Sequence, residues 1–271
     1  MIGCQSPNRN EAYRFKTFTF DLNEADESME FAKWKEKHLN DQPQIEPNIL
    51  FTQDSTPVGS LYYSDDEYQV YGYCFGEFGG ALLFQDAILK DSIYYLESTC
   101  PVMIDRRADG FYITSSSTHS GSAKIQFFES PKELINVPLD SLNGNWKEKR
   151  WPQLSNYEIA LKLGNQGQIL VDTAGLSFNL CFQFEDQNFL IYSNSKSTFL
   201  GKVTSGSIQL IDLLMRKPSW GYNYDPTDKI NGFFHYNFDQ GTGFSLRNPF
   251  QQEPSQGDIY VRNDTIVISH K

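Results

Sequence analysis

The chain is poor in the residues that common metal, nucleic-acid and membrane sites require. It has four His and four Cys, and none falls into the HExxH or CxxC spacing of zinc sites. Its 23 Lys and Arg are outnumbered by 34 Asp and Glu, and the formal charge of -11 would repel nucleic acid and anionic lipid surfaces. No stretch approaches the ~20 apolar residues of a membrane-spanning helix. We therefore expect no metal, no cofactor, no nucleic-acid partner and no membrane-spanning body.

Aromatic residues, in contrast, are abundant, with 21 Phe and 15 Tyr among 271 residues. They gather with β-branched residues in short segments that are separated by Gly, Pro, Asn and Asp, the pattern of strands and turns. This pattern predicts an all-β protein. The expected strands cover residues 13–21, 48–53, 60–63, 68–75, 81–85, 92–97, 102–105, 110–114, 123–128, 168–173, 177–184, 188–193, 197–203, 207–214, 231–238, 243–246, 258–262 and 265–269.

The strands from residue 78 to 132 are expected to form one meander, followed by a single helical turn at Pro131 and a loop over 137–152. Two short helices interrupt the strands. Residues 24–39 carry acids in the first turns and Lys and His in the last, and a narrow apolar stripe that suits packing on the outside of a sheet. Residues 155–163 begin with a capping box. We expect a tether over 1–12 and a single domain over 13–271.

The rhythm of the strands resembles the β-propeller superfamily, in which each blade is a four-stranded antiparallel meander. The resemblance is carried by turn glycines such as Gly110 and Gly206, by the segment 109–113, and by strand ends such as 127–131. It covers roughly residues 49–269, without WD or kelch signatures. The resemblance implies a propeller-like body with binding loops at one end. A β-sandwich and an α+β fold are the alternatives.

The first residues resemble the end of a bacterial lipoprotein signal, because Ile2 and Gly3 precede Cys4 and polar residues follow. This resemblance implies a lipid at Cys4, a place in the periplasm or at the outer membrane, and membrane contact through that anchor alone. The alternative is an ordinary thiol at a frayed terminus of a cytoplasmic protein. The other cysteines, Cys74, Cys100 and Cys181, lie in apolar strand-like segments and are interpreted as small buried hydrophobes.

Catalytic patterns are weak in this sequence. A nucleophile needs a neighbouring base, but there is no GxSxG elbow, and His119 stands in a Ser/Thr run that is first of all a turn. With 34 acids, no pair of carboxylates can be singled out for glycoside hydrolysis. The acidic triplet 65–67 lacks the spacing of a calcium loop and is interpreted as a solvated turn. The sequence therefore favours a protein without catalytic activity.

Binding is the function that the sequence favours, because charged and aromatic residues gather in segments between strands. Aromatic rings can stack on sugars, and Arg can bind carboxylates with two parallel hydrogen bonds. The candidate ligand-binding residues are Arg106, Arg107, His119, Trp220, Tyr222, Tyr224 and His235. We thus predict a cell-envelope lipoprotein that binds a glycan, a peptide or an envelope protein. A secreted or periplasmic glycan hydrolase with carboxylates that the sequence does not identify is the alternative.

Overall fold

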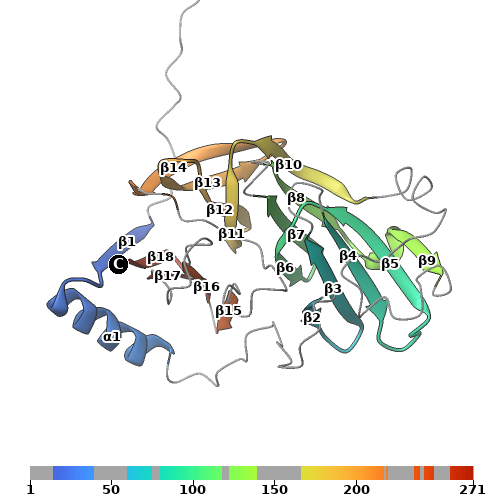
Figure 1. The fold of residues 1–271 in the computed structure, drawn as a ribbon, viewed down its shortest axis with the longest axis horizontal. Helices are drawn as coiled ribbons and strands as arrows, with labels where there is room; N and C mark the ends of the chain where they lie inside the picture. Colours follow the sequence, from blue (N-terminus) through green and yellow to red (C-terminus); the bar gives the residue numbers. More distant parts are fainter. Residues whose placement is uncertain are drawn as a thin grey trace, which may run out of the picture.

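The computed structural model describes nine parts of the chain, which are residues 15–39, 60–74, 80–117, 122–138, 166–216, 218, 235–238, 241–246 and 257–270. These residues form an all-β fold of four sheets with one α-helix (Figure 1). The expected strand at 48–53, the helix at 155–163 and the candidate residues Cys4, His119, Trp220, Tyr222 and Tyr224 lie outside the described residues.

The first sheet has the strand order β2-β3-β4-β5-β9, and the second has the order β10-β8-β7-β6. The strands of the first sheet are β2 (Ser60–Ser64), β3 (Tyr68–Cys74), β4 (Gly80–Asp86), β5 (Ser92–Ser98) and β9 (Ile135–Pro138). Those of the second sheet are β6 (Pro101–Arg107), β7 (Gly110–Ser117), β8 (Ser122–Phe128) and β10 (Gln168–Ala174). All neighbours in both sheets are antiparallel.

The third sheet is a meander of four consecutive strands, β11-β12-β13-β14, and the fourth has the order β1-β18-β17-β16-β15. The third contains β11 (Ser177–Phe184), β12 (Gln187–Ser193), β13 (Thr198–Thr204) and β14 (Ser207–Met215). The fourth contains β15 (His235–Phe238), β16 (Gly241–Leu246), β17 (Gly257–Arg262), β18 (Thr265–His270) and β1 (Lys16–Asp21). Here β1 runs parallel to β18, so the two ends of the described chain share one sheet.

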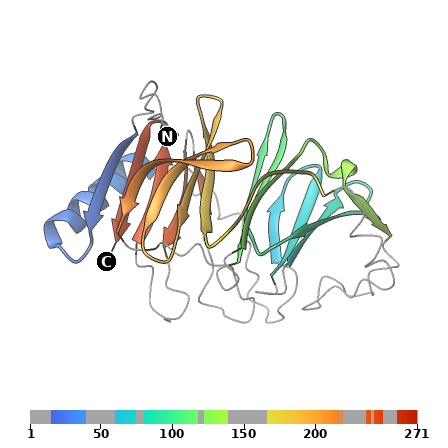
Figure 2. The same ribbon diagram turned by 90° about the horizontal axis from the view of Figure 1, so that it is seen from above.

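The four sheets follow one another in space as they do in the sequence, and each shares an apolar core with the next. Phe84 of the first sheet packs edge-on against Phe111 of the second, with ring centroids 5.6 Å apart. The second and third sheets share a core that contains Ile125 and Leu190. The third and fourth sheets share a core that contains Leu180 and Ile259. The molecule is thus a succession of sheets packed face to face, as Figure 2 shows from above.

One edge strand of each sheet lies toward the middle of Figure 1; these strands are β2, β6, β11 and β15. The opposite edge strands, β9, β10, β14 and β1, lie toward the outside. The sequence predicts four-stranded antiparallel sheets, whereas two of the four sheets have five strands and one of these contains the parallel pair β1–β18. Within the described residues the sheets form an open arc and do not close into a ring (Figure 1). The all-β prediction is therefore confirmed, whereas a closed propeller is not.

Helix α1 (Ala25–Leu39) confirms the expected helix and covers the free face of the fourth sheet (Figure 1). Its apolar stripe is narrow, and Phe31 is the side chain that it buries most deeply, with 5% exposed. The Phe31 ring stacks on Trp34 and packs at 6.3 Å from the ring of Tyr260 in β17. The helix therefore lies on the outside of a sheet, as its stripe predicts. It is not long and apolar enough to cross a membrane, and it is the only α-helix among the residues described.

Two expectations about the central block are wrong. The strands between residues 78 and 132 do not form one meander, because β4 and β5 belong to the first sheet, whereas β6, β7 and β8 belong to the second. The division falls at Pro101, the first residue of β6, and it lets the apolar faces of the two sheets cover each other. The loop expected from residue 137 begins too early, because Ile135–Pro138 form β9 and pair with β5. The alternation of Ile135, Asn136 and Val137 was the signal that the expected loop overlooked.

Candidate functional site

The structure places the predicted residues Arg106 and Arg107 at the end of β6, where three sheets meet. The hairpin from β6 to β7 turns at Ala108 and Asp109, and Gly110 follows with a φ of 143°. A Cβ on Gly110 would lie 2.4 Å from the carbonyl oxygen of Phe128, so only glycine fits this turn. Successive side chains of a strand point to opposite faces, and the two arginines therefore reach opposite neighbours of the second sheet.

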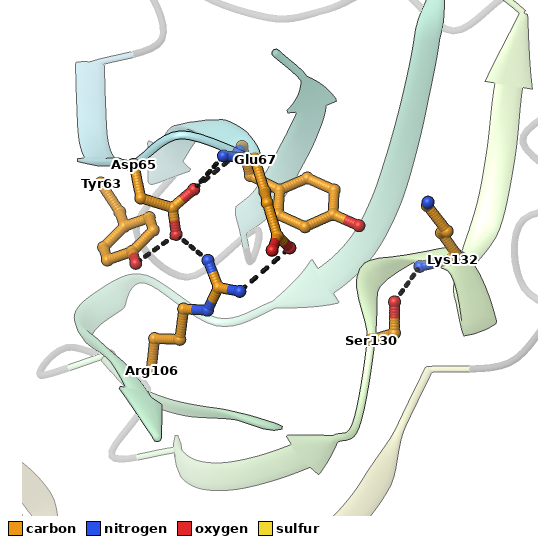
Figure 3. A network of polar contacts seen from close by, with 7 residues as sticks. Tyr63, Asp65, Glu67, Arg106, Ser130 and Lys132 are labelled. Atoms are coloured by element: carbon orange, nitrogen blue, oxygen red, sulfur yellow. Dashed lines mark hydrogen bonds and ion pairs between the residues drawn. The ribbon is translucent and has the colours of Figure 1, made fainter. Parts of the chain in front are cut away.

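Arg106 reaches the first sheet and binds the turn between β2 and β3 (Figure 3). Its Nη1 forms an ion pair with Oδ2 of Asp65, and its Nη2 lies 2.9 Å from Oε2 of Glu67. Its guanidinium lies 5.3 Å from the ring centroid of Phe111, the residue directly opposite it on β7. The Arg106 side chain stays 32% exposed. The guanidinium is therefore held in place by the Phe111 ring and by two carboxylates, and it still faces solvent.

Asp65 is the residue that organises this turn. Its Oδ1 accepts the backbone N–H groups of Glu67 and Tyr68, both at 2.7 Å, and its Oδ2 accepts the hydroxyl of Tyr63 at 2.5 Å. Burial opposes the charged form, but these hydrogen bonds and the bond from Arg106 outweigh it, so the pKa of Asp65 is lowered. The acidic triplet is a turn, as predicted, and Asp65 in it is an ionised anchor for Arg106.

The same contacts fix the protonation of the neighbouring groups. Burial, together with the hydrogen bond to Asp65, raises the pKa of Tyr63 to about 12. The hydrogen bond to Asp65 also raises the pKa of Arg106. At neutral pH the Tyr63 phenol is therefore protonated, Asp65 is a carboxylate and Arg106 is a guanidinium.

Arg107 reaches the third sheet and is much more deeply buried, with 9% of its side chain exposed. Its Nε lies 2.6 Å from Oδ2 of Asp105, and its Nη1 donates to Oδ1 of Asn188, a residue of β12. Its guanidinium stacks on Tyr112 at 3.9 Å from the ring centroid. Burial lowers the pKa of Arg107, but Asp105 more than compensates, and the result is a raised pKa. Nη2 has no hydrogen-bond partner within the described part of the chain.

Cys181 of β11 is a free and buried thiol next to this second cluster. Burial raises its pKa to about 11, although the nearby Arg107 opposes the shift. A thiol with such a pKa is protonated at neutral pH and is a poor nucleophile. The interpretation of Cys181 as a small buried hydrophobe thus agrees with its surroundings. Cys100 is also buried, but it is disulfide-bonded.

Among the predicted binding residues, the structure brings together Arg106 and Arg107, at one turn but on opposite faces. His235 is the first residue of β15 and pairs with Phe244, and its side chain is not described. Sequence reasoning missed Asp65, Asp105 and Asn188, which bind the arginines, and Tyr63, which donates to Asp65. The available signal was local: Asp105 and Arg107 are two residues apart on one face of β6. No group of three or more His, Cys, Asp or Glu that could hold a metal ion occurs in the described ranges.

The turns of three successive sheets therefore converge on two neighbouring arginines, one half-exposed and one buried. Such an arrangement can recognise a charged or hydrogen-bonding ligand at Arg106, while Arg107 fixes the position of the turn. Comparison with known proteins adds no family to this description, since no protein-family model and no curated protein matches the sequence.

Proposed function

We propose that this chain is a binding protein of the bacterial cell envelope, with a propeller-like body that recognises a glycan, a peptide or another envelope protein. The observation that carries the proposal is the convergence of the β2–β3, β6–β7 and β11–β12 regions on Arg106 and Arg107. Ligand sites on rigid β scaffolds are commonly built from such neighbouring turns. Arg106 is the recognition group, because it is prearranged and still accessible to solvent.

Replacement of Glu67 by a ligand carboxylate at Arg106 costs little free energy. The Glu67 side chain is 60% exposed, and exposed ion pairs contribute only about 0–1 kcal/mol. A carboxylate of an acidic sugar or peptide can replace Glu67 on Nη2, while Asp65 keeps the guanidinium oriented. Asp65 does not suit the alternative of a glycan hydrolase as its general acid, because that acid keeps its proton at neutral pH and the pKa of Asp65 is lowered.

Binding is tested by titrating the protein with acidic oligosaccharides, neutral oligosaccharides and short acidic peptides in a calorimeter. We expect binding to an acidic probe that Arg106→Ala weakens at least tenfold, in keeping with the loss of a charge-assisted hydrogen bond of about 1.5–3 kcal/mol. Lys124→Ala is the matched control, because Lys124 forms a long surface ion pair of 3.9 Å with Asp172. If no probe binds, or if both variants bind like the wild type, Arg106 is not the recognition group.

The place in the envelope is supported by two features. The residues around Cys4 resemble a lipoprotein signal, and Cys100 is disulfide-bonded, as is typical of proteins in oxidising compartments. The test is metabolic labelling of the natural gene product with an alkyne fatty acid. We expect labelling that Cys4→Ser abolishes and that Cys181→Ala, a change at a buried free thiol, leaves intact. If neither the wild type nor Cys181→Ala is labelled, the lipid anchor is contradicted, and the binding test is unaffected.

A further inference from the structure

The turn between β4 and β5, residues 87–91, is fixed by buried polar side chains. The carboxylate of Asp86, which is 6% exposed, accepts the N–H groups of Ile88 at 2.9 Å and of Leu89 at 2.8 Å. Nε2 of Gln85, which is 8% exposed, donates to the carbonyl of residue 90 at 2.7 Å. The N–H of Ala87 donates to the carbonyl of residue 67 and so links this turn to the β2–β3 turn. The conformation of the tip is therefore set before any partner arrives.

This rigid turn presents two large aliphatic side chains to solvent. Ile88 is 80% exposed and Leu89 is 61% exposed, the highest values among the large hydrophobic residues that the structure describes. The other described hairpin turns carry small or polar residues, as loops usually do. These turns are 65–67, 108–109, 185–186, 194–197, 205–206 and 263–264. The fold thus orders an apolar tip at one turn, where the others have polar tips.

We propose that Ile88 and Leu89 anchor the protein to a protein partner that offers an apolar pocket bordered by basic residues. Burial of anchors that are already ordered costs little conformational entropy, which is the condition for a tight contact of small area. The surroundings define the border of the pocket: Asp66 and Asp91 are exposed near the tip, Lys90 is the exposed base between Leu89 and Asp91, and the whole chain carries a charge of -11. A basic partner surface complements this potential and accelerates association.

Charge and area favour a protein over a bilayer as the occupant. The acidic residues near the tip are repelled by anionic lipid headgroups. A whole myristoyl chain gives only marginal membrane binding, about 10⁴ M⁻¹, and two aliphatic side chains bury fewer methylene groups than that chain. The tip adjoins the β2–β3 turn that holds Arg106, but its anchors Ile88 and Leu89 make no use of Arg106 and do not depend on a lipid at Cys4.

Site-specific photocrosslinking in the producing bacterium tests this proposal. A benzophenone amino acid replaces Leu89 in the full chain, and the same amino acid at Leu210, which is 57% exposed on β14, is the matched control. We expect one discrete protein adduct from position 89 that is absent from position 210 and is lost when Ile88→Ser is added. Adducts to lipid, no adduct, or the same adduct from both positions would overturn the proposal.

The partner that the crosslink identifies is then purified in its free form and titrated with the unmodified chain. We expect Ile88→Ser combined with Leu89→Ser to raise Kd at least 30-fold, and Leu210→Ser to change it less than twofold. The association rate should also fall as salt rises, because the acidic border steers a basic surface. Equal affinities of the two variants would refute the anchor role. Circular dichroism and the unfolding midpoint of each variant show that the fold is retained.

Discussion

Arg106 and Arg107 follow one another in β6, but they connect the second sheet to its two neighbours in different ways. Arg106 binds Asp65 and Glu67 of the first sheet and is 32% exposed, whereas Arg107 binds Asp105 and reaches Asn188 of the third sheet with 9% exposed. Both stack on an aromatic ring of β7. Because ion pairs are screened at the surface and costly to break when buried, Arg107 should matter for stability and Arg106 for recognition.

The apolar platform below Arg106 should have the largest effect on stability. Phe111 is 2% exposed, stacks on Phe128 and meets Phe84 edge-on, so Phe111→Ala leaves a cavity between the first and second sheets. We expect a loss of about 3–5 kcal/mol in the free energy of unfolding. Urea denaturation followed by circular dichroism measures this loss. A loss under about 1 kcal/mol would mean that the first two sheets do not share this core.

Removal of the partner of Arg107 should have the next largest effect. Asp105→Ala leaves a guanidinium that is nine-tenths buried with only the amide oxygen of Asn188 as its acceptor. We expect a loss of about 2–3 kcal/mol, toward the lower end for a broken buried ion pair because Asp105 is 26% exposed. The same denaturation experiment applies. Asp172→Ala, at a long surface ion pair with Lys124, should cost less than about 0.5 kcal/mol.

The smallest expected effect is a change in pH dependence at the Arg106 cluster. The pKa of Tyr63 is raised to about 12 in the folded protein, above its ordinary value of 10.0. The contribution of the Tyr63 phenol to the free energy of unfolding is therefore complete below pH 10 and is lost as pH rises toward 12. We expect Tyr63→Phe to lose less stability than the wild type over this range. Tyr71→Phe, whose hydroxyl donates to Gln69, is the control and should follow the wild-type profile.

Local patterns of the sequence predicted most of the strands, while the pairing of distant segments escaped them. Alternating aromatic and β-branched residues locate strands such as β11 and β14, and the acid-to-base gradient of residues 24–39 locates α1. The partner of β1 is β18 at the other end of the chain, and no local pattern specifies that choice. β9 overlaps the loop that the sequence predicts, and its partner β5 lies well before it in the chain.

The candidate site was predictable to the same extent. Alternation along β6 places Arg106 and Arg107 on opposite faces, and the glycine after Asp109 indicates a hairpin. Asp105 lies on the same face of β6 as Arg107, but the other acceptors, Asp65 and Asn188, come from neighbouring sheets, and Asp65 looked like one of many solvated acids. Which carboxylate binds which arginine depends on how the sheets pack, and a single sequence carries no signal for that packing.

The most direct test compares Arg106→Ala and Arg107→Ala in the same equilibrium unfolding experiment. We predict a loss of about 1 kcal/mol or less for Arg106→Ala and about 3 kcal/mol for Arg107→Ala, because one pair is exposed and the other buried. Binding of the acidic probe should change in the opposite order, falling at least tenfold for Arg106→Ala only. Equal losses of stability, or a larger loss for Arg106→Ala, would contradict the division of roles between the two arginines.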